Sequence, residues 1–174
     1  MPEDYQYLEG FSSRGNFNFD ILVNGKLSDK EQPAVKFNFG LADGSIQHSE
    51  LGSSIKDVSF AASFTNGTST SGKDAVFEIQ NFKGYFNREL IESKVRVTNL
   101  DNPRIQIDLD GTMPIESIVP LLGMSALTDG DGEMEFSNVH IDGKYEDMIR
   151  TSRIHRVDAT GTVSYTHLTL PTKA

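Results

Sequence analysis

The residues of this sequence that could do chemistry are four histidines and several acidic turns. His48, His140, His155 and His167 lie far apart, and no two of them have a spacing that places both on one strand face or one helix turn. A zinc site needs three or four such ligands that converge on one point. The histidines therefore predict no metal site, and we expect them to be solvent-facing residues of strands or loops.

Acidic residues beside glycine recur at 108–111, 129–132 and 142–143, and they raise the question of calcium. An EF-hand loop with its glycine at position 6 needs an acidic residue at position 1. The first two motifs place Gln106 and Leu127 at that position, so neither fits. We interpret all three motifs as turns that end strands, a role for which Asp and Gly are well suited.

The composition of the chain argues against several classes of function. The sequence has no cysteine, which excludes disulfides, cysteine-based zinc sites and thiol nucleophiles. It contains neither a G-x-S-x-G motif nor a glycine-rich phosphate loop. We therefore expect no enzyme and no cofactor. With 16 Lys+Arg against 25 Asp+Glu and a net charge of -9, the chain is also a poor candidate for binding nucleic acid.

Alternation of apolar and polar residues dominates the chain and predicts β-strands with one buried face. The alternating segments are residues 17–23, 35–41, 55–64, 75–79, 91–97, 105–109 and 134–141, with a return strand from Ile46 and a last strand within 151–162. Asp43-Gly44 predicts a hairpin turn. Their number, about nine, and their regular spacing indicate an antiparallel meander.

One segment has helical periodicity instead. Ile115, Ile118, Val119 and Leu122 follow the i, i+3, i+4, i+7 pattern, and Pro114 suits a first helical position. The predicted fold class is therefore all-β, mainly an antiparallel meander in a curved, groove-forming sheet, with one short helix near 114–122. No series of helices is available to cover the second face of the sheet.

Phenylalanine contributes 11 residues, most of them at alternating strand positions. Two interpretations of the apolar face stay open. It could be the core of a closed β-sandwich, as in a binding or adhesin-like module, or the interior of an open groove that binds acyl chains through burial of methylene groups. The candidate groove residues are Phe17, Phe19, Ile21, Val35, Phe37, Phe39, Val58, Phe60, Phe64, Phe77, Ile79, Val95, Val97, Ile105, Ile107 and Leu109.

The end of the sequence has an unusual feature. Residues 163–172, VSYTHLTLPT, resemble the translation of a transposon-end adapter used in sequencing libraries. A real terminal strand is the alternative, because Val163, Tyr165 and His167 alternate. We expect residues 1–162 to be a single β-rich domain, a fragment of a larger protein, and residues 163–174 to be a non-native tail. The absence of a signal peptide or a membrane-spanning run then carries little weight.

The order of motifs resembles the AsmA-like family of envelope proteins, which includes TamB-type proteins. The similarity covers about residues 16–143. It includes residues 32–39 (QPAVKFNF), residues 43–46 (DGSI), the strand and Asn-Leu-x-x-Pro turn at 97–105, and the D-x-x-G motif at 108–111 that precedes the predicted helix. These motifs are loose patterns of glycine, proline and alternation.

The resemblance implies a repeating antiparallel sheet curled into a groove with an apolar interior. It implies a non-enzymatic role in phospholipid transport and outer-membrane assembly, with phospholipid as the partner. It also implies a periplasmic location, with the full-length protein held in the inner membrane by an N-terminal anchor that this sequence lacks.

Overall fold

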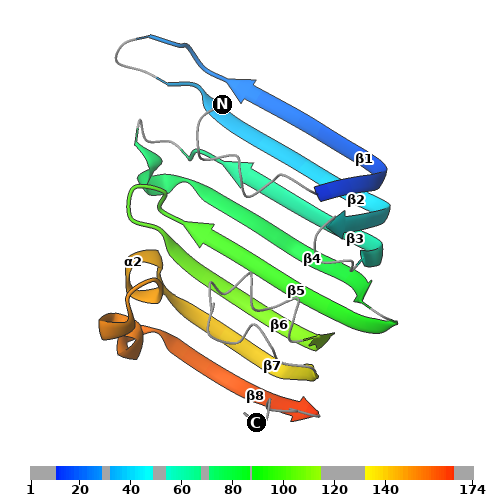
Figure 1. The fold of residues 1–174 in the computed structure, drawn as a ribbon. Coiled ribbons are helices and arrows are strands. Elements are labelled where there is room, and N and C mark those ends of the chain that lie inside the picture. Colours follow the sequence, from blue (N-terminus) through cyan, green and yellow to red (C-terminus); the bar gives the residue numbers. More distant parts are fainter. Residues whose placement is uncertain are drawn as a thin grey trace.

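The chain forms one open antiparallel β-sheet in the computed structural model, which describes residues 11–28, 32–48, 54–67, 71–86, 88–114 and 132–166. Eight strands lie side by side in sequence order (Figure 1). They are β1 (Phe11–Asn24), β2 (Ala34–His48), β3 (Ser54–Thr65), β4 (Val76–Phe86), β5 (Glu89–Thr98), β6 (Arg104–Pro114), β7 (Glu133–Lys144) and β8 (Asp158–Thr166). Every neighbouring pair is antiparallel, so the predicted all-β meander is confirmed.

Helical structure in the described part of the chain is short and lies in the connections. A 3₁₀ turn, η2 (Gly72–Asp74), precedes β4. The helix α2 (Tyr145–Met148) and the 3₁₀ helix η4 (Thr151–Arg156) join β7 to β8. The predicted last strand at 151–162 was therefore wrong in its first half, where Arg153 and Ile154 occupy η4, and β8 starts at Asp158 and continues to Thr166. Pro114 ends β6, and residues 115–122 of the predicted helix lie outside the described residues.

Irregularities interrupt the strand register across almost the whole sheet. Only the β5–β6 pair has continuous register, and every other pair contains a shift. Asp43-Gly44 lies at such a shift inside β2, so the predicted hairpin turn there was wrong. Asp110-Gly111 likewise continues β6 instead of ending it. Both Asp-Gly pairs supply the positive φ that a β-bulge requires, 52° at Asp43 and 130° at Gly111.

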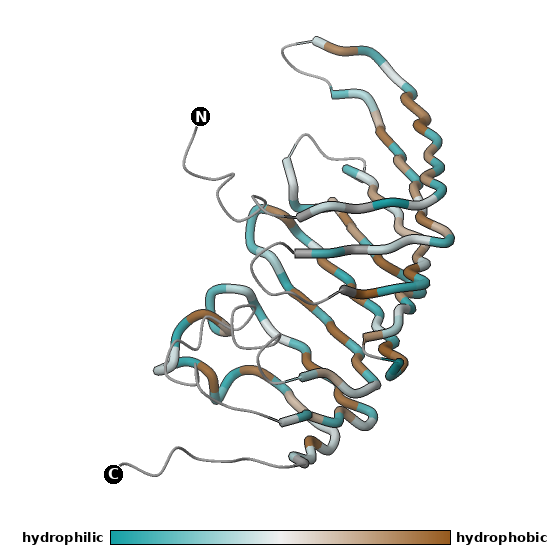
Figure 2. Tube along the Cα trace, turned by 45° about the vertical axis from the view of Figure 1, so that its right-hand side comes forward, coloured by the Kyte–Doolittle hydropathy of each residue, from teal (hydrophilic) through white to brown (hydrophobic). Residues whose placement is uncertain are grey.

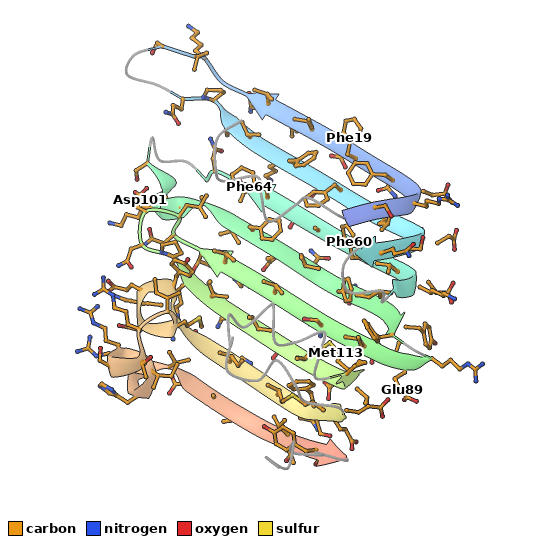
Figure 3. All side chains as sticks on the ribbon, in the orientation of Figure 1. Phe19, Phe60, Phe64, Glu89, Asp101 and Met113 are labelled. Atoms are coloured by element: carbon orange, nitrogen blue, oxygen red, sulfur yellow. The ribbon has the colours of Figure 1, made fainter. Side chains whose placement is uncertain are left out.

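The bulges bend the strands, and Figure 2 shows that the sheet is strongly curved instead of flat. Apolar side chains fill the inside of this bend. A Cβ atom placed on Gly44 would lie 2.9 Å from Cγ of Leu41, and one on Gly15 would lie 2.8 Å from Cδ1 of the same leucine. Val58, which pairs with Gly44, is completely buried. The side chains of Phe19, Phe60 and Phe64 lie on the side of the sheet that faces the viewer in Figure 3, which is the concave side in Figure 2, so the apolar side is the concave one.

The core is small for a sheet of this size. Among the described residues, the buried hydrophobic ones are Val58, Ala62, Ala75, Phe86, Ile91 and Val139. A closed β-sandwich would cover the apolar face with a second sheet, but the described residues form a single sheet. On this face Phe17, Phe19, Ile21 and Val23 of β1 are each more than half exposed, so the face is open at its β1 edge.

Candidate functional site: an apolar sheet face

The strand register places the candidate groove residues on one face of the sheet. Residues directly opposite in an antiparallel pair project to the same side. Phe19 lies opposite Phe39, Phe37 opposite Phe64, and Phe64 opposite Phe77. The same relation continues through Val97 and Ile105 to β6 and through Ile107 and Ile141 to β7. All sixteen candidates join this apolar face, with Val58 at the bend.

Aromatic rings cluster at the β1–β4 end of the apolar face. Phe39 is the centre of the cluster, with its ring centroid 5.0 Å from that of Phe37 in a stacked arrangement and 6.0 Å from that of Phe60 in an edge-on one. The rings of Phe17 and Phe77 each lie 6.3 Å away. Figure 3 shows that Phe19, Phe60 and Phe64 rise from β1 and β3 on the side facing the viewer.

Exposure falls across the face from the β1 edge inward. Phe17, Phe19 and Ile21 are 57%, 63% and 58% exposed. The candidates from β2 inward are half-buried, apart from the fully buried Val58. Half-burial on one side of a sheet means that neighbouring rings cover the flanks of each side chain while its outer surface stays open. The face can therefore accept an apolar ligand without displacing a packed core.

Several members of the apolar face were missed by the sequence reasoning. Phe82 pairs with Ser93 and Gly111 pairs with both Ile91 and Phe136, so these positions continue the face beyond the bulges. A bulge inserts one residue and so reverses the alternation of side chains. A strict period-2 pattern therefore assigns the residues beyond the bulge to the wrong face. The glycine and Asn-Phe breaks in the alternation, such as Asn81-Phe82, were the available signal.

The opposite face of the sheet is polar and carries cross-strand charge pairs. Arg96 Nη1 lies 2.6 Å from Glu78 Oε1, and Lys83 Nζ lies 2.6 Å from Glu92 Oε1. The hydrogen bond and charge of Glu92 raise the pKa of Lys83. These partners are directly opposite in register, so each pair bridges two adjacent strands. Such exposed pairs contribute little individually to stability.

Asp142 is the most enclosed of the ion-paired side chains on this polar face. Its side chain is 16% exposed, and Oδ1 lies 2.7 Å from Arg104 Nε. Gln106 Nε2 donates a hydrogen bond of 3.0 Å to the other carboxylate oxygen. The Arg104 guanidinium beside it, opposed in part by desolvation and assisted by the Gln106 hydrogen bond, lowers the pKa of Asp142 below its usual value. The carboxylate is therefore held ionised as part of the β6–β7 pairing.

Among the described side chains, no histidine belongs to a group that could hold a metal ion. His140 Nδ1 lies 2.7 Å from Asp108 Oδ1 on the polar face, and both side chains are about half exposed. His155 is exposed in η4. His48 ends β2, with its side chain outside the described set, and His167 lies beyond the described residues. No group of three or more His, Asp or Glu side chains that could hold a metal ion occurs within the described ranges.

Shallow depressions occur on the polar side of the sheet. One is lined by Lys83, Glu92, Lys94, Asp108 and Asp110, among others, close to the bulges of β4 and β6. Its charged groups include the Lys83–Glu92 ion pair and Asp110, whose Oδ1 accepts a 2.7 Å hydrogen bond from the Asn138 backbone N–H. Because these polar groups already bond to one another between strands, the depression offers few groups to a ligand. The apolar face is therefore the better candidate site.

None of the helices within the described residues is long and apolar enough to span a membrane. No family model, no curated protein and no solved structure matches this chain.

Proposed function

We propose that the chain is a non-enzymatic segment of an AsmA-like envelope protein that binds phospholipid acyl chains along its apolar sheet face. In this proposal it acts in lipid transport and outer-membrane assembly, in the periplasm, and the full-length protein is held in the inner membrane. The observation that carries the proposal is the continuous apolar face that runs from β1 to β8 and stays open at β1, where Phe19 is 63% exposed.

The size and chemistry of the face suit an acyl chain. Neighbouring strands are about 4.8 Å apart, so eight strands give a face about 34 Å wide. Each methylene group removed from water contributes about 0.8 kcal/mol. Stacked and edge-on phenylalanine rings, as around Phe39, offer flat surfaces that need no polar partner from the ligand. A bent sheet with its apolar side inside adds contacts from two directions.

Lipid extraction of the purified chain, followed by mass spectrometry, tests this function directly. We expect phospholipid to co-purify with the chain, and the delipidated chain to take up a fluorescent fatty acid. A chain that is folded by circular dichroism, carries no lipid and takes up no fatty acid would refute the proposal. The closed-core alternative predicts that outcome, because a face covered by a second apolar layer has no room for a ligand.

A further inference from the structure

The segment between β7 and β8 differs in charge from the rest of the chain. Residues 144–156 contain Lys144, Arg150, Arg153 and Arg156 against two carboxylates, whereas the whole chain has 16 Lys+Arg and 25 Asp+Glu. Lys144, Arg150 and Arg156 are exposed. A local cluster of cations on an acidic protein marks a surface that attracts an anionic partner.

The same segment exposes large apolar side chains. Tyr145, Ile149 and Ile154 are 49%, 61% and 52% exposed. Leu100, 46% exposed, lies in the adjacent β5–β6 turn, which is joined to α2 because the Tyr145 backbone N–H donates a 2.8 Å hydrogen bond to the Pro103 carbonyl. Apolar and cationic side chains are thus interleaved on one projection from the sheet.

Internal contacts fix this projection so that its isoleucines face outward. Asp147 is only 5% exposed, and its Oδ1 lies 3.6 Å from Arg153 Nη1 and 3.8 Å from Arg156 Nη1. Met148 and Val157 pack against Gly143, where a Cβ atom would lie 3.3 Å and 3.1 Å from their side chains. The inner residues therefore anchor α2 and η4 to β7.

The projection stands at one end of the strands. In a meander the odd-to-even connections share one end of the sheet, so the β5–β6 turn and the α2–η4 segment lie together there. Figure 3 shows Asp101 of the β5–β6 turn at this end and Glu89 at the opposite one. Leu27, 82% exposed in the β1–β2 connection, belongs to the same end.

We propose that residues 144–156 dock the chain on the surface of a bilayer that contains anionic phospholipid. Arginine and lysine bind lipid phosphates, while exposed isoleucine and tyrosine enter the boundary between headgroups and acyl chains. An acidic protein would use the cations but would leave Ile149 and Ile154 unexplained. The docking surface is independent of the proposed acyl-chain site, because it shares no residue with the apolar face.

Vesicle flotation of the 174-residue chain tests the docking. The probes are vesicles of phosphatidylcholine alone and of phosphatidylcholine with about one third phosphatidylglycerol. We expect binding to the anionic vesicles only, and loss of that binding at about 1 M salt. Each cation contributes about fivefold to partitioning, so Lys144→Gln/Arg150→Gln should weaken binding about thirtyfold. Neither residue forms an ion pair among the described residues, so this variant should fold.

Matched variants test whether binding depends on the cations of residues 144–156 in particular or only on the total charge of the chain. Lys56→Gln/Arg88→Gln removes the same charges from exposed positions at the other end of the sheet and should leave binding unchanged. Ile149→Ser/Ile154→Ser should reduce binding with the charge intact. Equal flotation with both vesicle types, or full binding by Lys144→Gln/Arg150→Gln, would overturn the proposal. Absence of flotation at low salt would also overturn it, and it would leave an acidic protein as the alternative partner. Fatty-acid uptake, measured without vesicles, reports on the apolar face separately.

Discussion

Ile21 and Leu22 are neighbours in β1 with nearly the same exposure, 58% and 59%, yet they project from opposite faces of the sheet. Ile21 lies opposite Phe37, and Leu22 lies opposite Lys36. One side chain therefore belongs to the aromatic face and the other to the polar face. The pair offers an internal control for any experiment that asks which face of the sheet binds a ligand.

Ile21→Asp should reduce fatty-acid uptake about tenfold, because a carboxylate on the apolar face costs roughly 1.4 kcal/mol or more of binding free energy. Leu22→Asp should leave uptake unchanged, since its carboxylate would sit on the polar face beside Lys36. Fluorescence titration of both delipidated variants is the measurement. Equal losses in the two variants would show that the apolar face has no special part in binding.

Val58→Ala should lower the free energy of unfolding by about 2 kcal/mol, because Val58 is completely buried at the bend and its methyl groups leave a cavity. Val23→Ala, at a position 58% exposed on the same face, should cost less than about 0.5 kcal/mol. Urea unfolding followed by circular dichroism compares the two. Similar midpoints for both variants would argue that the bend is not the stable core of the sheet.

Much of this fold follows from local alternation. The apolar residues of segments such as 17–23 and 105–109 repeat with period 2, and an unbroken register then brings them to one face. The pattern could not show that Asp43-Gly44 forms a bulge, because a hairpin and a bulge both use Asp-Gly with positive φ. At Asp43-Gly44 the choice depends on pairing with β3, which is a long-range contact.

The structure of residues 144–156 was harder to predict, for a different reason. Residues 151–156 have no strong helical pattern, and their 3₁₀ structure depends on the buried Asp147 and on packing over Gly143. The sequence also could not show that the apolar face is uncovered, since the same alternation suits a sandwich core and a groove. Only the three-dimensional arrangement distinguishes a face covered by a second sheet from one that is not.

Gly111→Ala should destabilise the chain by roughly 1–3 kcal/mol, since Gly111 has φ of 130° and a Cβ atom there would lie 2.8 Å from Cα of Ile91. The bulge of β6 would have to change for an alanine to fit. Gly143→Ala is the control, because the atoms nearest to its new Cβ belong to the side chains of Val157 and Met148, which can shift, and not to the backbone. In thermal unfolding, Gly111→Ala should have a clearly lower melting temperature than Gly143→Ala. The reverse order would contradict this account of the bend.

Asp142 links stability to pH through its ion pair with Arg104. Because folding lowers the pKa of this carboxyl, the folded state binds the proton more weakly than the unfolded state. The stabilisation is therefore fully present above the unfolded-state pKa of about 4, and it is lost as the pH falls through the lower pKa of the folded state.

Asp142→Asn should therefore be clearly destabilised at about pH 7, and its difference from the wild type should shrink as the pH falls below about 3. Urea midpoints across this range measure the effect. Asp20→Asn is the control, because Asp20 accepts hydrogen bonds from the Asn38 amide and has no cationic partner among the described residues. A destabilisation of Asp142→Asn that stays constant with pH would mean that the Asp142 side chain acts through packing and its Gln106 hydrogen bond alone, without help from its charge.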